Sequence, residues 1–481
     1  MRDGDTPDRG EKTASELFAA GKNPPDNSPT LYRDPLICLV PLALAFPPLL
    51  AYGARTLGWP GGWLSTRVAL IACIVVFLFL RLVRRDFTYR RIPGLAFVAP
   101  YLLLVIASVT WSVLGPYNPD ASAIANELLT WLILAAVFVL IAGSSHREGD
   151  LKAAGRVLIA VAVIQVVYSG FQALVLVGME RFVPAPIVAV TQYARNDLEF
   201  GSLRLHGTLP NLGPNFFGAF LLVPTVLAFN RSLSQRGWAR FGWLIAGISC
   251  AGVIGATYSR GALLALVVAL LMIPVWRRSW RGVTGMIVTV ATAALIVLQT
   301  PVGRHVIELY EFGQLDPSGA ARVYLWKAIF KNAADHPLGL GFNAWPRASR
   351  ASMDVGLGDL PESFGAPHPA ENQWMRELAD RGIPGVFALA LLLAGMVRLT
   401  FQATHPNRST GYARDFLVSA GAASVGWAFV FLTGDHLTYE NVAGIFWYSS
   451  ALALAATRDA GLLGAREVAS RALEESLVES T

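Results

Sequence analysis

The residues best suited to chemistry in this sequence are arginines that lie beside long apolar segments. Arg204, Arg260 and Arg322 each fall in or next to a connection between such segments. A guanidinium group binds phosphate oxygens through two parallel N–H bonds and keeps its charge at any ordinary pH. Several such groups beside a membrane indicate a site for an anion at the interface, and a lipid-linked diphosphate is a natural ligand.

Arg260 is confined to the membrane surface by its neighbours. The segment Thr257-Tyr258-Ser259-Arg260-Gly261-Ala262 joins two apolar runs with almost no loop. Arg204 lies in a longer connection, within Ser202-Leu203-Arg204-Leu205-His206. An arginine that only anchors a loop to lipid phosphates is the alternative explanation for Arg204.

Arg322 is predicted to lie on an amphipathic helix over residues 319–334. The pattern places Val323, Trp326, Ile329 and Phe330 on one apolar face. Arg322 and Trp326 are four residues apart and share an edge, so a cation beside an aromatic plane can hold a phosphate and stack on a sugar. Simple docking of the helix through Trp326 is the alternative.

Glu371 is the candidate base, within His368-Pro369-Ala370-Glu371-Asn372-Gln373-Trp374. One interpretation is a helix cap with Pro369 as the first helical residue and Glu371 as the third. The other places Glu371 on the helical stripe of Trp374, with the charged residues 376, 377, 380 and 381 pointing elsewhere. A carboxylate on an apolar face is partly desolvated and is a better general base for a sugar hydroxyl, whereas an adjacent arginine acts in the opposite direction.

These residues must be positioned by membrane-spanning helices. The chain has 481 residues, of which 54% are hydrophobic and 15% charged, and its mean hydropathy is +0.48. The apolar residues form separate runs long enough to cross about 30 Å of hydrocarbon as helices. The formal charge of +6 comes from arginines in short loops, which disfavours nucleic-acid binding.

We predict an all-α polytopic membrane protein with about twelve spans, near residues 36–53, 64–82, 92–113, 126–143, 157–178, 211–229, 241–257, 261–276, 282–300, 382–400, 415–433 and 441–457.

Every second connection is rich in arginine and is therefore predicted to be cytosolic. The alternate connections then face the periplasm of a bacterium, and those of residues 179–210 and 301–381 are long enough to carry function. The predicted organisation is a disordered cytosolic tail (1–35), nine spans (36–300), a large periplasmic loop (301–381), three spans (382–457) and a cytosolic tail (458–481).

Transport and metal chemistry are both disfavoured by the sequence. Ion-coupled transporters bury charged groups near the middle of the bilayer, whereas Gln165 and Gln172 are the main polar residues inside the predicted spans. Asp3-Gly4-Asp5, the only Asp-x-Asp, lies in the predicted cytosolic tail. No metal and no cofactor are therefore expected. A small-anion transporter of bicarbonate type and a non-catalytic scaffold for envelope assembly remain as alternatives.

Four motifs together resemble the superfamily of O-antigen ligases and Wzy-type O-antigen and exopolysaccharide polymerases. They are Gly207-Thr208-Leu209-Pro210-Asn211-Leu212-Gly213-Pro214-Asn215, then Ser259-Arg260-Gly261-Ala262, then Arg322-x-x-x-Trp326 followed by Pro337-x-Gly339-x-Gly341, and Asn372 followed after nine residues by Gly382-Ile383-Pro384-Gly385. In order and spacing they cover residues 200–400, and the predicted topology is similar as well.

The resemblance implies a GT-C-like fold with a helical periplasmic cap between the ninth and tenth spans. It implies a metal-independent glycosyltransferase of the inner membrane that uses an undecaprenyl-diphosphate-linked oligosaccharide, with a chain-length regulator or export complex as a possible partner. A polymerase delivers the glycan to another repeat unit, and a ligase delivers it to lipid A-core or protein.

Arg260 and Arg322, and more distantly Arg204, match family arginines that engage the diphosphate, and Trp326 and Asn372 lie in the same motifs as candidate substrate-binding residues. The family usually has His-Asn where this chain has Glu371-Asn372, which favours a polymerase, with Glu371 or His368 as the base.

Overall fold

The computed structural model describes residues 35–56, 65–85, 89–114, 121–144, 146, 148–197, 204–209, 213–288, 317–345, 370–405 and 408–479. Within these ranges every regular element is helical. The helices are α2 (Pro35–Ala45), α3 (Pro47–Thr56), α4 (Thr66–Arg84), α5 (Leu95–Leu114), α6 (Ala121–Gly143), α7 (Glu148–Leu176), η1 (Glu180–Phe182), α8 (Ala185–Asp197), α9 (Gly213–Ser234), α10 (Gly237–Ala256), α11 (Arg260–Trp276), α14 (Pro317–Asp335), α16 (Gln373–Ala403), α17 (Gly411–Val430) and α18 (Glu440–Glu479).

Seven of the described helices are long and apolar enough to cross a membrane: α4, α5, α6, α7, α9, α10 and α16. Two shorter apolar helices, α2 and α11, accompany them. The structure thus has the character of a polytopic helical membrane protein, and it does not establish the predicted count of twelve. The predicted span 36–53 is broken, because α2 ends at Ala45 and α3 begins at Pro47. The predicted span 282–300 extends past the described residues.

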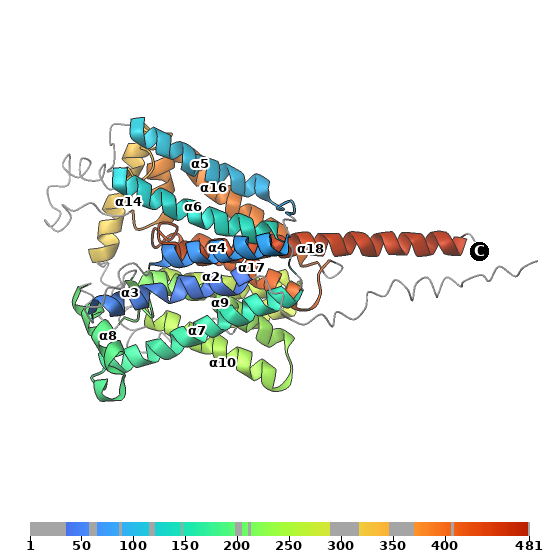
Figure 1. The fold of residues 1–481 in the computed structure, drawn as a ribbon, viewed down its shortest axis with the longest axis horizontal. Helices are drawn as coiled ribbons and strands as arrows, with labels where there is room; N and C mark the ends of the chain where they lie inside the picture. The colour runs from blue at the N-terminus through green and yellow to red at the C-terminus, as the bar shows by residue number, and fades with distance from the viewer. Residues whose placement is uncertain are drawn as a thin grey trace, which may run out of the picture. The chain divides into compact units, whose positions relative to one another are not determined.

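The core of the bundle is built around α9 and α17. α17 packs on α9, α11 and α16, and Figure 1 shows α17 and α9 in the middle of the bundle. Its small residues permit this close approach: a Cβ added at Gly421 would lie 2.2 Å from Trp276 Nε1, and one at Gly426 would lie 2.9 Å from the carbonyl oxygen of Ala265. Small residues at helix interfaces are the usual way in which membrane helices pack closely.

The arginine-rich connections meet at one end of the bundle. Arg81 donates to Ser144 Oγ at 3.0 Å, and Arg231 and Arg277 both pair with Asp415. The Glu148 carboxylate accepts from the Tyr412 backbone N–H at 3.2 Å. We call this the basic end; the connections that carry the candidate chemistry lie at the opposite ends of these helices.

Candidate functional site

Two of the family-like motifs meet as one backbone joint between α16 and the turn that follows α14. The N–H groups of Leu340 and Gly341 donate to the carbonyls of Ala379 and Asp380, at 2.8 and 3.0 Å, and the N–H of Ile383 donates to the carbonyl of Pro337 at 3.0 Å. These bonds are possible because α16 is non-helical at Gly382, where φ is 63°. A Cβ at Gly382 would lie 2.1 Å from the Pro337 oxygen. Glycine is therefore needed at this joint, because the two backbone segments lie too close together to leave room for a Cβ.

The same turn is fixed to α5. Trp111 Nε1 donates to the Gly339 carbonyl at 3.0 Å, and Ser112 Oγ donates to the Phe342 carbonyl at 2.6 Å. In return the Phe342 N–H donates to the Ser108 carbonyl at 2.9 Å. The helix that carries Arg322 is thus attached to the bundle through a rigid turn.

The buried face of α14 differs from the predicted one. Leu325 and Ile329 are buried in a small core with Leu340 and Trp345, and Trp326 is partly buried beside them. Phe330, which the pattern placed on the apolar face, is 54% exposed. The helix is rotated because its partner is the 340–345 turn and α16, which a helical pattern cannot identify.

Glu371 lies just before α16 rather than inside it, so both predicted interpretations, the helix cap and the helical stripe shared with Trp374, are wrong. Asn372 is the N-cap, and its side-chain oxygen accepts from the Met375 N–H at 3.2 Å. Glu371 itself has a φ of 49°, in the left-handed region that a residue with a Cβ rarely adopts. Strain of this kind persists where surrounding contacts enforce it, and it is concentrated at functional sites.

The strained conformation is held by the loop between α17 and α18. Asp435 accepts from the N–H groups on both sides of Glu371: from Ala370 at 3.2 Å and from Asn372 at 3.0 Å. The Gln373 N–H donates to the Phe431 carbonyl at 2.7 Å. Burial raises the pKa of Asp435 to about 7, against the lowering effect of the Arg376 charge and of these two N–H donors.

The Glu371 side chain meets Arg322 across this site. Arg322 Nε donates to Glu371 Oε2 at 2.7 Å, and the side chains are 27% and 38% exposed. The structure therefore joins two residues that are 49 positions apart in the sequence. Both ends of the pair remain accessible to a ligand.

The first turns of α16 carry buried charges, which were predicted to point away from the apolar stripe. Arg376 contacts Asp380 at 2.5 Å, Glu127 at 3.4 Å and Asp435 at 3.6 Å. Arg381 pairs with Glu377, which also accepts from the Tyr101 hydroxyl at 2.7 Å. Such residues can be buried because each charge has a partner of opposite sign.

Arg204 and Arg260 both lie at the turn between α10 and α11, beside the loop that holds Glu371. Arg204 donates through Nε to the Thr257 carbonyl and through Nη2 to Asn215 Oδ1, both at 2.9 Å. Arg260 is exposed as the first residue of α11, whose N-cap is Ser259. A Cβ at Gly261 would lie 2.1 Å from Thr433 Oγ1, so this turn packs against the loop that holds Glu371.

Two histidines near the site are buried. Burial lowers the pKa of His206 to about 4 and that of His436 to about 3. Gln172 Nε2 lies 3.1 Å from His206 Nδ1 and also donates to the Gly207 carbonyl at 3.1 Å. The His436 ring packs on Phe216. These side chains hold the Gly207-Thr208-Leu209 motif and the 431–439 loop in place.

The predicted site residues thus have different positions. Arg322 and Glu371 form a direct pair, Trp326 is on the same helix, and Arg204 and Arg260 lie at the adjoining turn. Asn372, predicted to bind substrate, caps α16. His368 lies outside the described residues.

The sequence did not identify Asp435 and Arg376 as supports of Glu371, because only the folded chain brings three separate segments together. Within the described residues, no group of three or more His, Cys, Asp or Glu could hold a metal ion.

The comparison with known families confirms the resemblance found in the motifs. A family model described as O-antigen ligase matches residues 244–390. The matched region includes Arg260, Arg322, Glu371 and Asn372, whereas Arg204 precedes it. No curated protein matches the chain.

Proposed function

We propose that this chain, whose residues 244–390 match the O-antigen ligase model, is an inner-membrane glycosyltransferase that polymerises an O-antigen or exopolysaccharide. Its donor is a glycan linked to undecaprenyl diphosphate, and the reaction takes place at the periplasmic face. The observation that carries this proposal is the accessible Arg322–Glu371 pair, held at 2.7 Å.

The pair supplies the two functions that the transfer needs. The hydroxyl of the acceptor sugar attacks the anomeric carbon of the donor, forming a new C–O bond while the C–O bond to the diphosphate breaks. The hydroxyl proton passes to Glu371 as general base, and the electron pair leaves on the diphosphate, whose charge Arg322 stabilises. A bound diphosphate competes with Glu371 for Arg322, which frees the carboxylate to accept the proton.

The remaining residues support this pair. Arg260, exposed at the start of α11, adds a second cation for the diphosphate. Arg204 positions the Arg260 turn through its bond to the Thr257 carbonyl. Trp326 offers a partly buried aromatic surface for a sugar, and Asn372 fixes the start of α16. The accessible carboxylate at position 371, where the resemblance expects histidine, favours polymerase; the ligase is the second candidate, because the matching model carries that description.

Replacement of the two paired residues tests the proposal in purified protein supplied with a polyprenyl-diphosphate-linked oligosaccharide. Glu371→Gln and Arg322→Ala are each expected to lower release of polyprenyl diphosphate by roughly 100-fold or more. Lys331→Ala is the matched control, since Lys331 is an exposed cation on the same helix. A ladder of longer lipid-linked glycans indicates a polymerase, and transfer only to lipid A-core indicates a ligase. Wild-type rates in both variants would refute the proposal.

A charge exchange separates chemistry from folding. The double variant Arg322→Glu, Glu371→Arg keeps an ion pair at the same place but exchanges the base and the phosphate ligand. We expect it to restore the melting temperature lost in the single variants and to leave transfer abolished. Recovery of activity in the double variant would instead mean that the pair is structural.

A further inference from the structure

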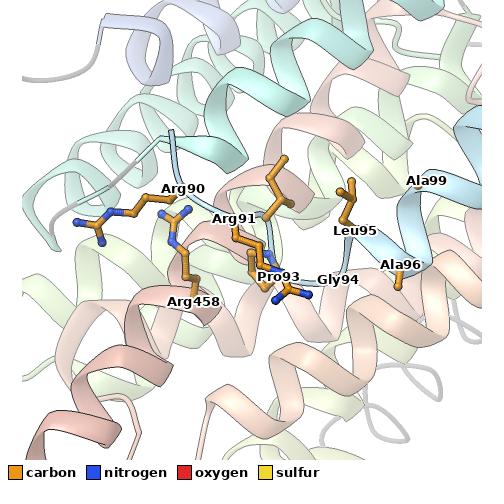
Figure 2. A pocket seen from close by; sticks show the side chains of 9 residues that line it. Arg90, Arg91, Pro93, Gly94, Leu95, Ala96, Ala99 and Arg458 are labelled. Carbon is orange, nitrogen blue, oxygen red and sulfur yellow. The ribbon is translucent and has the colours of Figure 1, made fainter. Parts of the chain in front are cut away.

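A hollow lies at the basic end of the bundle, at the N-terminus of α5. It encloses about 910 Å³ and is lined by Arg90, Arg91 and Arg458 together with residues 92–96 and Ala99. Figure 2 shows Arg90 and Arg458 at one end of the hollow, the Arg91 side chain beside Pro93 and Gly94, and Leu95, Ala96 and Ala99 following α5 away from them. The site adjoins none of the residues assigned above to glycosyl transfer.

The three arginines form a cationic group with an excess of positive charge, and Arg458 is its anchored member. Arg458 donates to the carbonyls of Ala142 and Ser144, at 3.0 and 2.6 Å, which anchors it to the end of α6. The Asp459 carboxylate lies beside them: its Oδ1 accepts from Arg458 Nε at 3.0 Å and lies 3.8 Å from Arg90 Nη1. Arg91 is exposed and has no ion pair within the described part of the chain. Among the described residues, Arg90 and Arg458 therefore share the Asp459 carboxylate, and Arg91 adds a third positive charge.

Beyond the hollow, the outer face of α5 remains apolar. Ala96 and Ala99 are followed at helical spacing by Leu103 and Ile106, which are 64% and 54% exposed. The opposite face of the helix, with Val98, Tyr101 and Val105, is buried in the bundle. Such a stripe, with two small residues next to the arginines and larger exposed ones beyond them, can serve as a shallow channel for an alkyl chain.

We propose that this hollow binds an anionic phospholipid of the cytosolic leaflet. Its phosphate lies between Arg91 and Arg90, and one acyl chain follows Ala96 and Ala99 along α5. Charge complementarity selects an anionic headgroup, since basic pockets between helices on the cytosolic side bind the head groups of anionic lipids. The apolar stripe selects a lipid over a free phosphate compound. This site goes beyond the proposed transfer reaction and does not depend on it.

Binding is tested with the full-length protein in nanodiscs, by native mass spectrometry and thermal unfolding against the mole fraction of phosphatidylglycerol. We expect retained lipid and a raised melting temperature in the wild type, and an apparent affinity about fivefold lower in Arg91→Ala. Ala99→Phe, which fills the channel without changing charge, is expected to abolish the retained lipid. Arg240→Ala is the matched control, because Arg240 is an exposed arginine of α10 outside the hollow.

Three results would overturn the assignment. Equal lipid retention in Arg91→Ala, Ala99→Phe and Arg240→Ala would mean that the hollow is not the site. An equal effect of phosphatidylcholine would exclude selection by charge, and an equal effect of soluble glycerol phosphate would exclude a lipid. Because no glycosyl donor is present, these outcomes are independent of whether the chain transfers glycan.

Discussion

The exposed position of Glu371 depends on Asp435, which does not need to contact substrate. Asp435 fastens the amides on both sides of it, and Arg376 lies 3.6 Å from Asp435. Because the fastening acts through the backbone, it constrains φ of Glu371 while leaving the side chain accessible to Arg322. We therefore regard Asp435 as a positioning residue, whose loss should change the rate of transfer more than the binding of donor.

The ionisation of Asp435 makes folding stability depend on pH. Its pKa is about 7 in the folded protein and near the ordinary 3.8 in the unfolded chain, so between these values the folded state keeps a proton that the unfolded state releases. Stability should therefore fall as pH rises from about 4 to 7 and level off above 7. Asp435→Asn should flatten this slope in melting curves recorded in detergent. Asp335→Asn, at an exposed acid of α14, serves as control, and an unchanged slope in Asp435→Asn would contradict the assignment.

At the scale of elements, the joint between α16 and the Pro337–Gly341 turn transmits the position of α14 to the bundle. The sequence predicts the turn, since its proline and glycines are local signals. It does not predict that α16 begins at Gln373, nine residues before the expected start of the tenth span at Gly382. Hydropathy treats the charges at Arg376, Asp380 and Arg381 as exposed. In the structure they pair along α16 itself, Arg381 with Glu377 and Arg376 with Asp380, and Arg376 and Asp380 also have partners on α6, in the turn and in the 431–439 loop. Such pairing is a tertiary property.

Gly382→Ala tests the joint. The new Cβ would lie 2.1 Å from the Pro337 oxygen, and the alanine would have to adopt a φ of 63°. We therefore expect the free energy of unfolding to fall by roughly 2 kcal/mol or more. Glycan transfer should fall as well, because α14 and Arg322 would shift relative to Glu371. Gly252→Ala is the matched control: a Cβ there meets nothing within 4 Å, and in a helix the change is neutral or slightly stabilising. Equal melting temperatures for the two variants would show that the joint carries no strain.

At the scale of the whole molecule, apolar patterning predicts the class of fold but not the number of crossings. α2 and α3 divide one apolar run at Pro47, and α11 spans only 17 residues. α17 is not among the seven candidate spans, although it lies at the centre of the bundle. Its small and polar residues are adapted to neighbouring helices rather than to lipid, so lipid-based criteria underestimate it.

Sidedness is the premise on which both proposed sites depend, and it can be measured directly. In a variant without Cys38, Cys73 and Cys250, single cysteines replace Leu338 in the turn beside the site and Trp238 at the start of α10; these positions are 64% and 90% exposed. α10 and α11 connect the basic end to the Arg260 turn and back, so the two positions should face opposite sides of the membrane.

A membrane-impermeant maleimide applied to intact cells should label the cysteine at 338 and not the one at 238. Permeabilised cells should show both labelled. Labelling of 238 alone from outside would place the Arg322–Glu371 pair in the cytosol, where a periplasmic lipid-linked donor could not reach it.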